Sequence, residues 1–202
     1  MSDFRLNARS AFGAAEPRIR TIGAYRVVER TDLALSSLAA RVEWTDVHNP
    51  STTILGCPLP GVGGLREDAG VTTFWTGPDQ WMVMAPLQTH EDLAADLTSA
   101  LGERAAVTDQ TDGWVAFDLT GEGLETVLEG LTSLDIRAMG AGGAARTVME
   151  HMGCFLLCRD PGRAYTLLVG RSFAVSLAHA LEMRLNTTLA LTTAKTRSDR
   201  AV

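Results

Sequence analysis

The sequence predicts an α+β protein built as two ferredoxin-like halves, in which antiparallel or mixed sheets carry their helices on one face. One observation is a unit of strand, tight turn, strand and helix that occurs twice, at about 71–102 and 154–185. The other is a further strand and helix between the copies, at about 115–131. Right-handed crossovers would fold this order of elements into such sheets.

The elements before the first copy have weaker patterns. Tyr25–Trp44 and Ser51–Leu55 are predicted to be strand-like, and within the first of them Ala34–Ala40 fits either a strand or a helix. Pro58–Gly64, with the sequence PLPGVGG, is predicted to be a loop.

The first copy begins at Val71 and turns at Gly77-Pro78-Asp79-Gln80, where proline fixes the backbone dihedral. A helix follows, with Thr89 as the expected N-cap and Gly102 as the expected end. One apolar stripe marks the buried face of this helix: Leu93, Leu97 and Leu101.

The central unit and the second copy are assigned from the same kinds of pattern, namely alternating strands and apolar helix faces. Val115–Leu119 alternates like a strand, and the helix after it carries Leu124, Val127, Leu128 and Leu131. The second copy turns at Asp160-Pro161-Gly162 and enters its helix after Arg171-Ser172. The apolar face of that helix consists of Ala174, Leu177, Ala178 and Leu181.

These elements predict one double-lobed domain at 21–190, with halves at about 21–103 and 104–190. A flexible N-terminal arm at 1–20 and a polar tail at 191–202 complete the expected organisation.

The composition indicates which kinds of partner and which cellular compartment to expect. The net charge of −6 offers no broad field for nucleic acid or for an anionic membrane. No apolar run reaches the roughly 20 residues of a membrane span, and the N-terminus lacks a signal-peptide core. Three cysteines, an odd number, favour a reducing compartment. We therefore expect a cytoplasmic protein that binds neither nucleic acid nor membrane.

Three segments resemble one known superfamily. GPDQWMVMAP, at 77–86, resembles the GP-D/E-x-W hairpin of the glycine-cleavage T-protein and folate-binding superfamily. TDQTDGWVAFDLTG, at 108–121, resembles its next strand and helix, and 145–181 resembles its later hairpin and helix. Within the superfamily, TDQTDGW together with RT-x-x-E-H-x-x-C and the RSFA helix is similar to the gamma subunit of heterotetrameric sarcosine oxidase. The resemblance covers about 55–185.

This resemblance implies an accessory subunit of a complex that oxidatively demethylates sarcosine to glycine. The other products are hydrogen peroxide and either formaldehyde or 5,10-methylenetetrahydrofolate. The implied partners are the alpha, beta and delta subunits, which in that family hold FAD, FMN, NAD, zinc and tetrahydrofolate. The resemblance implies no cofactor bound by this chain itself and a non-catalytic role within an oxidoreductase that acts on CH-NH groups.

The alternative is a stand-alone folate-binding protein, related to aminomethyltransferases or to iron–sulfur and RNA-modification factors. Those factors carry a K-G-C-Y-x-G-Q-E signature, whereas Cys57 lies in LGCPLP without a neighbouring Lys or Gln. True aminomethyltransferases are longer and add a barrel domain.

Two acidic residues are candidates for acid/base chemistry. Asp109 and Asp112 lie close together in sequence, as an acid/base pair requires. Asp112-Gly113 directly precedes a strand, however, so the sequence favours turn chemistry or a buried cap for these carboxylates.

His151, Cys154 and Cys158 form a candidate metal set. If their segment is one strand, His151 and Cys154 point to opposite faces. Cys154 and Cys158 then stand about 13 Å apart, too far for one zinc ion or a disulfide. The sequence therefore favours buried cysteines and a hydrogen-bonded histidine.

Two further patterns suggest ligand binding. Gly61-Val-Gly-Gly lacks the Lys and Ser/Thr of a phosphate loop, and Arg66 replaces the last glycine of GxGxxG, so we expect a flexible surface loop. Trp75 and Trp81 could stack on a pterin ring, but their alternation favours the core or a subunit contact.

Ser172 lacks the Gly-x-Ser-x-Gly context of a nucleophile. Arg146, Glu150 and His151 form a polar run that we expect to orient a partner through hydrogen bonds or ion pairs. The sequence thus predicts no catalytic, cofactor-binding or metal-binding residue in this chain.

Overall fold

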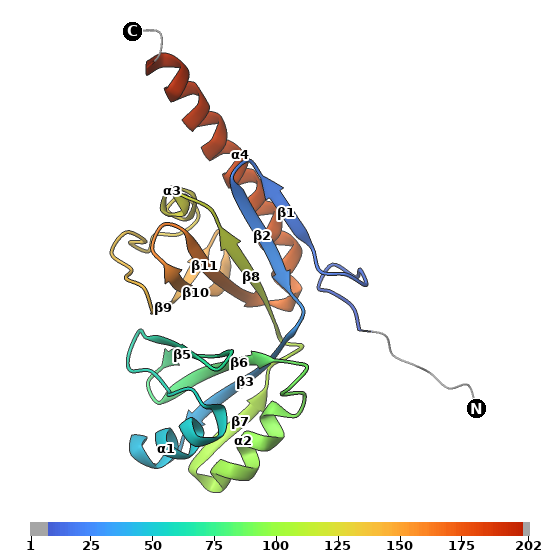
Figure 1. Ribbon diagram of the computed structural model, residues 1–202, viewed down its shortest axis with the longest axis vertical. Helices are drawn as coiled ribbons and strands as arrows, with labels where there is room; N and C mark the ends of the chain where they lie inside the picture. The colour runs from blue at the N-terminus through green and yellow to red at the C-terminus, as the bar shows by residue number, and fades with distance from the viewer. Residues whose placement is uncertain (1–7, 200–202) are drawn as a thin grey trace, which may run out of the picture.

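Four layers make up the protein in the computed structural model, which describes residues 8–199 and the side chains of residues 8–194. Two antiparallel sheets lie face to face in the middle, and each sheet carries helices on its outer face (Figure 1). We call residues 33–109 lobe 1, and residues 8–30 together with 114–199 lobe 2.

Lobe 1 contains five strands in the order β4-β5-β6-β3-β7. The strands are β3 (Leu33–Ala40), β4 (Leu65–Asp68), β5 (Val71–Gly77), β6 (Gln80–Pro86) and β7 (Ala105–Asp109). Helices α1 (Trp44–Leu55) and α2 (Leu93–Leu101) cover the outer face, and the short helix η1 (Gly102–Arg104) follows α2. Leu93, Leu97 and Leu101 are all buried there, as the apolar stripe predicts.

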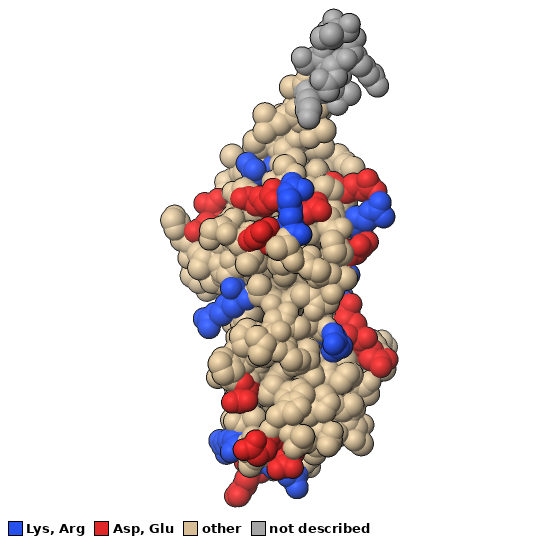
Figure 2. Space-filling model, turned by 90° about the vertical axis from the view of Figure 1, so that its left-hand side faces the viewer, with Lys and Arg blue, Asp and Glu red and all other residues tan. Residues whose placement is uncertain are grey.

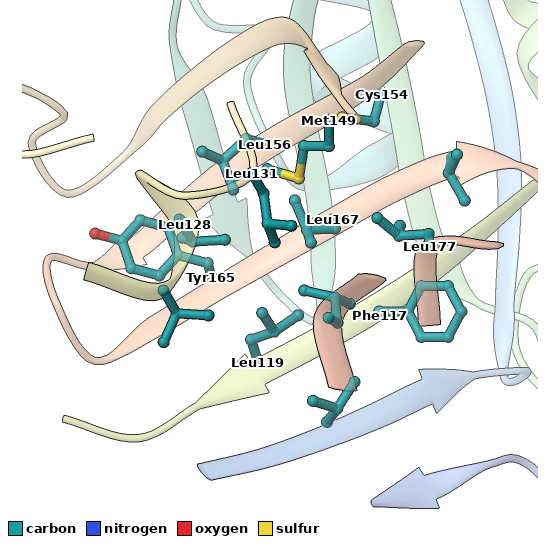
Figure 3. Packing of buried hydrophobic residues seen from close by; sticks show 14 of the residues in the cluster. Phe117, Leu119, Leu128, Leu131, Met149, Cys154, Leu156, Tyr165, Leu167 and Leu177 are labelled. Carbon is teal, nitrogen blue, oxygen red and sulfur yellow. The ribbon is translucent and has the colours of Figure 1, made fainter. Parts of the chain in front are cut away.

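Lobe 2 contains six strands in the order β1-β2-β8-β11-β10-β9. The strands are β1 (Ile19–Ile22), β2 (Tyr25–Arg30), β8 (Trp114–Thr120), β9 (Gly143–Met149), β10 (Met152–Asp160) and β11 (Ala164–Gly170). Helices α3 (Leu124–Leu128) and α4 (Ala174–Asp199) cover its outer face, with η2 (Arg171–Phe173) leading into α4. Leu128, Tyr165 and Leu177 belong to its buried core (Figure 3).

Each lobe has the split β-α-β arrangement of a ferredoxin-like fold, which confirms the predicted fold class. In lobe 1 the four strands in the order β5-β6-β3-β7 all come from one continuous segment of the chain. In lobe 2 the corresponding order is β10-β11-β8-β2, so its last strand comes from the N-terminal part of the chain. The two strand-turn-strand-helix units occupy equivalent positions in the two sheets.

The lobes therefore do not divide the chain at about 103, as the predicted halves did. The chain crosses from lobe 2 to lobe 1 after β2 and returns after β7. This exchange occurs because β2 pairs with β8 from Arg26↔Thr120 to Arg30↔Ala116, while β7 pairs with β3. Strand pairing between segments far apart in sequence leaves no local sequence signal.

The inner faces of the two sheets share an apolar interface. Its buried residues are Leu35, Leu65, Phe74, Met82 and Met84 from lobe 1 and Ala116, Ala144, Phe155, Leu157 and Leu168 from lobe 2. Polar side chains continue this interface: Arg30 bonds Asp118, Thr166 bonds Asp118, and Arg159 bonds both Thr166 and Glu67 of lobe 1. The shared core and these bonds fix the two lobes against each other.

The segment Ser51–Leu55 is helical rather than the predicted strand. Thr52, Thr53 and Ile54 are β-branched, which favours a strand locally. The segment is nevertheless helical, because Val47, Ser51 and Leu55 are buried at helical spacing. The Ser51 hydroxyl also donates to the Val47 carbonyl at 2.7 Å. Ala34–Ala40, left open between strand and helix, lies in β3.

The predicted cap of α2 is also wrong. The helix begins after Asp92, and the Thr89 hydroxyl instead contacts the Pro86 carbonyl and the His90 ring. Gly102 does follow the last residue of the helix, with a φ of 54°.

The expected N-terminal arm is docked from residue 8 onward, and residues 1–7 lie outside the described residues. The carboxylate of Glu29, itself buried, accepts the backbone N–H groups of Ala11 at 2.7 Å and Arg18 at 2.8 Å. Phe12 packs edge-on against Phe117, with ring centroids 6.2 Å apart. These bonds and this contact order a segment that the sequence predicted to be flexible.

The expected polar tail at 191–202 begins within α4, which continues to Asp199. Alanine and leucine around position 190 favour a helix, and the Thr193 hydroxyl donates to the Leu189 carbonyl one turn earlier at 2.9 Å. Residues 200–202 lie outside the described part of the chain.

A candidate partner-binding groove along α4

Helix α4 presents two apolar faces. One face is buried in lobe 2 and consists of Ala174, Leu177, Ala178, Leu181 and Leu185. The second follows helical spacing from Phe173, the last residue of η2, through Ala180, Met183 and Leu191 of α4, and Ala180 also packs against the core. Phe173 is 47% exposed, Met183 59% and Leu191 65%. A row of large exposed apolar side chains is characteristic of a protein-binding surface.

An open groove of about 690 Å³ lies beside this second face. Its walls are α4, the turn between β9 and β10, and the segment after α3. The polar lining is dominated by basic and imidazole groups, namely His151, His179 and Arg184, with Glu150 as the acid. The groove thus combines an apolar wall with a polar lining in which Arg184 and Glu150 carry opposite charges.

The turn between β9 and β10 positions Glu150 and His151 at the groove. Glu150 has a φ of 54°, and its N–H donates to the Leu131 carbonyl at 3.1 Å. A left-handed conformation at a residue other than glycine is strained, so this bond helps to hold the turn. His151 is exposed in this turn and is not on a strand as expected, because Met149 pairs with Met152 across a tight hairpin.

Arg184 forms part of the groove floor. Its guanidinium donates through Nη2 to the Thr126 carbonyl at 3.3 Å, while its Nε is buried without a hydrogen-bond partner. A Cβ at Gly130 would overlap this guanidinium, so the glycine provides the space that Arg184 occupies.

The predicted polar run divides between two places. Arg146 lies on β9, with its guanidinium 5.9 Å from the centre of the Phe155 ring. Phe155 belongs to the interface between the lobes, whereas Glu150 and His151 line the groove.

Cys154 and Cys158 are buried on β10, as free thiols whose side chains pack in lobe 2. Burial raises the pKa of Cys154 to about 11, and burial likewise raises the pKa of Cys158. Both thiols therefore stay protonated at neutral pH. Cys57 is buried in lobe 1, with its Sγ 3.6 Å from the Thr73 hydroxyl.

Asp109 and Asp112 do not face each other. Asp109 accepts the Thr111 N–H at 2.9 Å within the turn that leads from β7 to β8. The Asp112 side chain is 98% exposed and lies 3.9 Å from Arg171. Ser172 is exposed in η2 and hence lies outside any buried catalytic setting.

The glycine-rich segment at 61–64 lies at the surface at Gly61 and Val62, as predicted, but Gly63 and Gly64 pair with lobe 2. The Gly63 carbonyl accepts the Ala144 N–H at 2.8 Å, and Leu65 donates to the Gly142 carbonyl at 2.7 Å. Gly64 also forms an isolated bridge with Gly143. Backbone pairing across the lobes orders this segment.

Trp81 is buried in lobe 1 and Trp75 is partly buried beside it. Both lie on the outer face of the sheet and therefore do not contribute to the interface between the lobes. The Trp81 indole N–H donates to the Pro60 carbonyl at 2.8 Å.

On one face of the molecule, the charged side chains do not gather into a field of a single sign. On the face shown in Figure 2, acidic and basic side chains are interspersed, and a broad uncharged area covers much of its lower half. Within the described residues, no group of three or more His, Cys, Asp or Glu side chains is placed to hold a metal ion. No helix in the described part of the chain has the length and apolarity to span a membrane.

The fold belongs to the class of two-lobed α+β domains found in sarcosine oxidase and in aminomethyltransferases. A chain of the heterotetrameric sarcosine oxidase from Corynebacterium sp. U-96, in complex with pyrrole 2-carboxylate, is similar to this protein with a TM-score of 0.71 and 24% identity. That match covers 82% of this chain and 87% of the other. At this identity the likeness establishes the fold alone.

Aminomethyltransferase T of the glycine cleavage system from Bartonella henselae is similar with a TM-score of 0.54 and 15% identity. That match covers 76% of this chain but only 44% of the longer enzyme. Comparison with protein-family models gives no match, and neither does comparison with curated proteins.

Sequence reasoning missed the second apolar face of α4. Its signal is present in the spacing of Ala180, Met183 and Leu191 after Phe173 of η2, but the core face of α4 gives a stronger pattern. It also missed Trp44, which it assigned to the end of a strand. Trp44 is the first residue of α1 and lies beside the hairpin of β5 and β6.

Proposed function

We propose that this chain is a non-catalytic accessory subunit, of the gamma type, in a sarcosine oxidase complex. The observation that carries this proposal is the similarity to a chain of a heterotetrameric sarcosine oxidase over 87% of that chain's length. The two chains are thus of similar size and have the same two-lobed fold. The complex would demethylate sarcosine to glycine, with hydrogen peroxide and formaldehyde or 5,10-methylenetetrahydrofolate as products.

The groove along α4 is the surface by which the subunit would dock. Its exposed apolar wall would lose contact with water on assembly, which stabilises a protein interface. Its polar lining includes His151, His179, Arg184 and Glu150. We infer that the occupant is an apolar segment of a larger subunit, with polar side chains that meet this lining.

The alpha, beta and delta subunits would hold the cofactors, namely FAD, FMN, NAD, zinc and tetrahydrofolate, and this chain would bind none. Its role would then be to support the folded state or the orientation of a larger subunit. Because the three cysteines are free thiols, we also propose a cytoplasmic location.

Affinity purification of the tagged full-length chain from its native cell tests this proposal. We expect three co-purifying chains, flavin absorbance in the isolated complex, and peroxide production from sarcosine. Recovery of the chain alone at native expression levels, without sarcosine-dependent peroxide, would contradict the proposal.

Two variants of α4 separate the docking surface from a general effect on the helix. Met183 and Val175 are both 59% exposed, but only Met183 lines the groove. We expect Met183→Glu to reduce recovery of the partner chains at least about tenfold, while Val175→Glu leaves recovery unchanged. Equal recovery with both variants would assign the docking surface to another part of the protein.

The second candidate is the stand-alone folate-binding protein. A cavity of about 550 Å³ favours it, because this cavity lies where the chain crosses between the lobes. Trp114 could stack a pterin there, and Arg9 and Arg171 also line the cavity and could pair with carboxylates. Calorimetric titration of the purified chain with tetrahydrofolate distinguishes the two functions: saturable binding that Trp114→Ala removes would favour the folate-binding protein.

A further inference from the structure

Three of the four tryptophans of the chain line one groove on lobe 1. This groove has a volume of about 340 Å³ and lies at the hairpin end of β5 and β6, beside the start of α1. We call it the tryptophan groove. Its lining consists of Trp44, Trp75 and Trp81 with Pro60, Gly61, Val62, Pro78 and Asp79.

The indole rings come together through backbone pairing and stacking. Trp75 and Trp81 are directly opposite in the ladder between β5 and β6, so both side chains lie on the face that α1 covers. Trp44 packs on the Trp81 ring with centroids 5.2 Å apart and on the His48 ring at 4.4 Å. Trp75 makes no such ring pair among the described residues, and it is partly buried against the apolar core of lobe 1.

Part of this aromatic surface is open to solvent. Trp81 forms the buried base, while Trp44 is 36% exposed and Trp75 is partly exposed. Val62 at the rim is 84% exposed. Aromatic residues otherwise concentrate in cores and interfaces, so a cluster left open in this way points to a ligand.

Asp79 supplies the charge of the tryptophan groove, and it is the one charged residue in the lining. Its backbone is fixed in the hairpin turn with a φ of 55°, and its carbonyl accepts the Ala40 N–H at 2.8 Å. The carboxylate itself makes no ion pair or hydrogen bond within the described residues. The faces of indole rings carry a negative electrostatic potential, so the tryptophan rings and the Asp79 carboxylate together attract a cation.

The lining also restricts the kind of cation. Three backbone carbonyls of the lining already have donors: the Pro60 carbonyl accepts the Trp81 indole N–H, the Gly61 carbonyl the Gly64 N–H, and the Asp79 carbonyl the Ala40 N–H. A guanidinium or a primary ammonium would need several further acceptors for its N–H groups. A methylated ammonium has few or no N–H groups and is bound through its methyl surface and its charge.

We propose that the tryptophan groove binds the methylated ammonium group of a small organic cation, with Trp44 and Trp75 against its methyl groups and Asp79 as the counter-charge. This site lies on lobe 1, whereas the α4 groove lies on lobe 2. The proposal therefore does not depend on the proposed function as an oxidase subunit.

Titration of the purified full-length chain with choline tests the proposal. Tryptophan fluorescence and the indole N–H signals in NMR spectra measure the binding. The matched probe is 3,3-dimethylbutan-1-ol, which has the shape of choline without its charge. We expect saturable binding of choline and at least about fivefold weaker binding of the neutral alcohol, in line with a cation–π contribution at a partly exposed site.

Variants then locate the binding site. Asp79→Asn keeps the side-chain size and tolerates the left-handed backbone, and we expect it to weaken choline binding at least about threefold. Trp75→Leu should weaken it by a similar factor, with circular dichroism as the check on folding. Asp68→Asn, an exposed acid on β4 outside the groove, is the charge control and should leave binding unchanged.

Four results would overturn the assignment. These are equal affinity for choline and the neutral alcohol, no saturable binding of choline, an effect of Asp68→Asn as large as that of Asp79→Asn, and tighter binding of N-acetylarginine amide than of choline. The last result would identify a guanidinium site instead.

Discussion

Replacement of Glu29 by alanine should strongly destabilise the protein, because this buried carboxylate holds the N-terminal segment on lobe 2. Its two oxygens accept the backbone N–H groups of Ala11 and Arg18, at 2.7 and 2.8 Å, and Glu29 is 1% exposed. Alanine would remove both acceptors and leave both donors without a protein partner.

The expected magnitude follows from these two bonds. Hydrogen bonds to a charged group contribute about 1.5–3 kcal/mol each, so the upper range is about 3–6 kcal/mol. Both donors are only partly buried, so water can replace part of the loss, and the cost of burying the carboxylate disappears. We therefore expect a loss near 3 kcal/mol, which for a domain of this size lowers Tm by about 6–12 °C.

Urea unfolding followed by circular dichroism measures this loss, with proteolysis at Arg9 and Arg18 as a local readout. Glu29→Gln keeps one acceptor and should lose about half as much. Glu122→Ala is the surface control, since its side chain is 81% exposed and its ion pair with Arg163 contributes little. A loss for Glu29→Ala below about 1 kcal/mol, equal to that of the control, would refute the reasoning.

The same contacts predict the effect of deleting residues 1–18. If residues 1–20 were a flexible arm, as the sequence predicts, this deletion would leave the melting temperature almost unchanged. The structure predicts a clear decrease, because the deletion removes the partners of Glu29 and the contact of Phe12 with Phe117. Differential scanning calorimetry distinguishes the two expectations.

Three further predictions concern pH, thiol reactivity and packing. Burial raises the pKa of Glu182, but the hydrogen bonds and charges of Arg18 and then Arg20 outweigh this effect and hold the pKa below its ordinary value of 4.5. The ion pairs therefore contribute stability above about pH 4.5, and this contribution should be lost as the pH falls through the lower pKa of the folded state. Glu182→Gln should flatten this part of the curve of Tm against pH. Iodoacetamide should label Cys154 slowly at pH 8 and rapidly in urea by mass spectrometry, since burial raises its pKa to about 11. Leu181→Ala should cost about 3 kcal/mol in urea unfolding, and Leu191→Ala, which is 65% exposed in the native protein, less than about 0.5 kcal/mol.

The candidate sites show where sequence patterns stop being informative. The apolar spacing of α4 reveals its core face, but only the structure shows which polar residues stand opposite its second face. Glu150 and His151 reach the groove through a two-residue turn, whereas the sequence suggested one continuous strand there. Trp44 joins Trp75 and Trp81 because α1 packs beside the hairpin, a contact between segments separated by about 30 residues.

The sequence by itself determined the fold class, the repeated strand-turn-strand-helix unit and the buried faces of α2 and α4. Those features depend on local spacing, since residues 3 or 4 apart share a helix face and residues 2 apart share a strand face. The tertiary structure alone decided that β2 completes lobe 2 and that Glu29 orders the N-terminal segment. It also decided that 51–55 is helical, because long-range pairing and burial outweigh the weak preferences of the local chain.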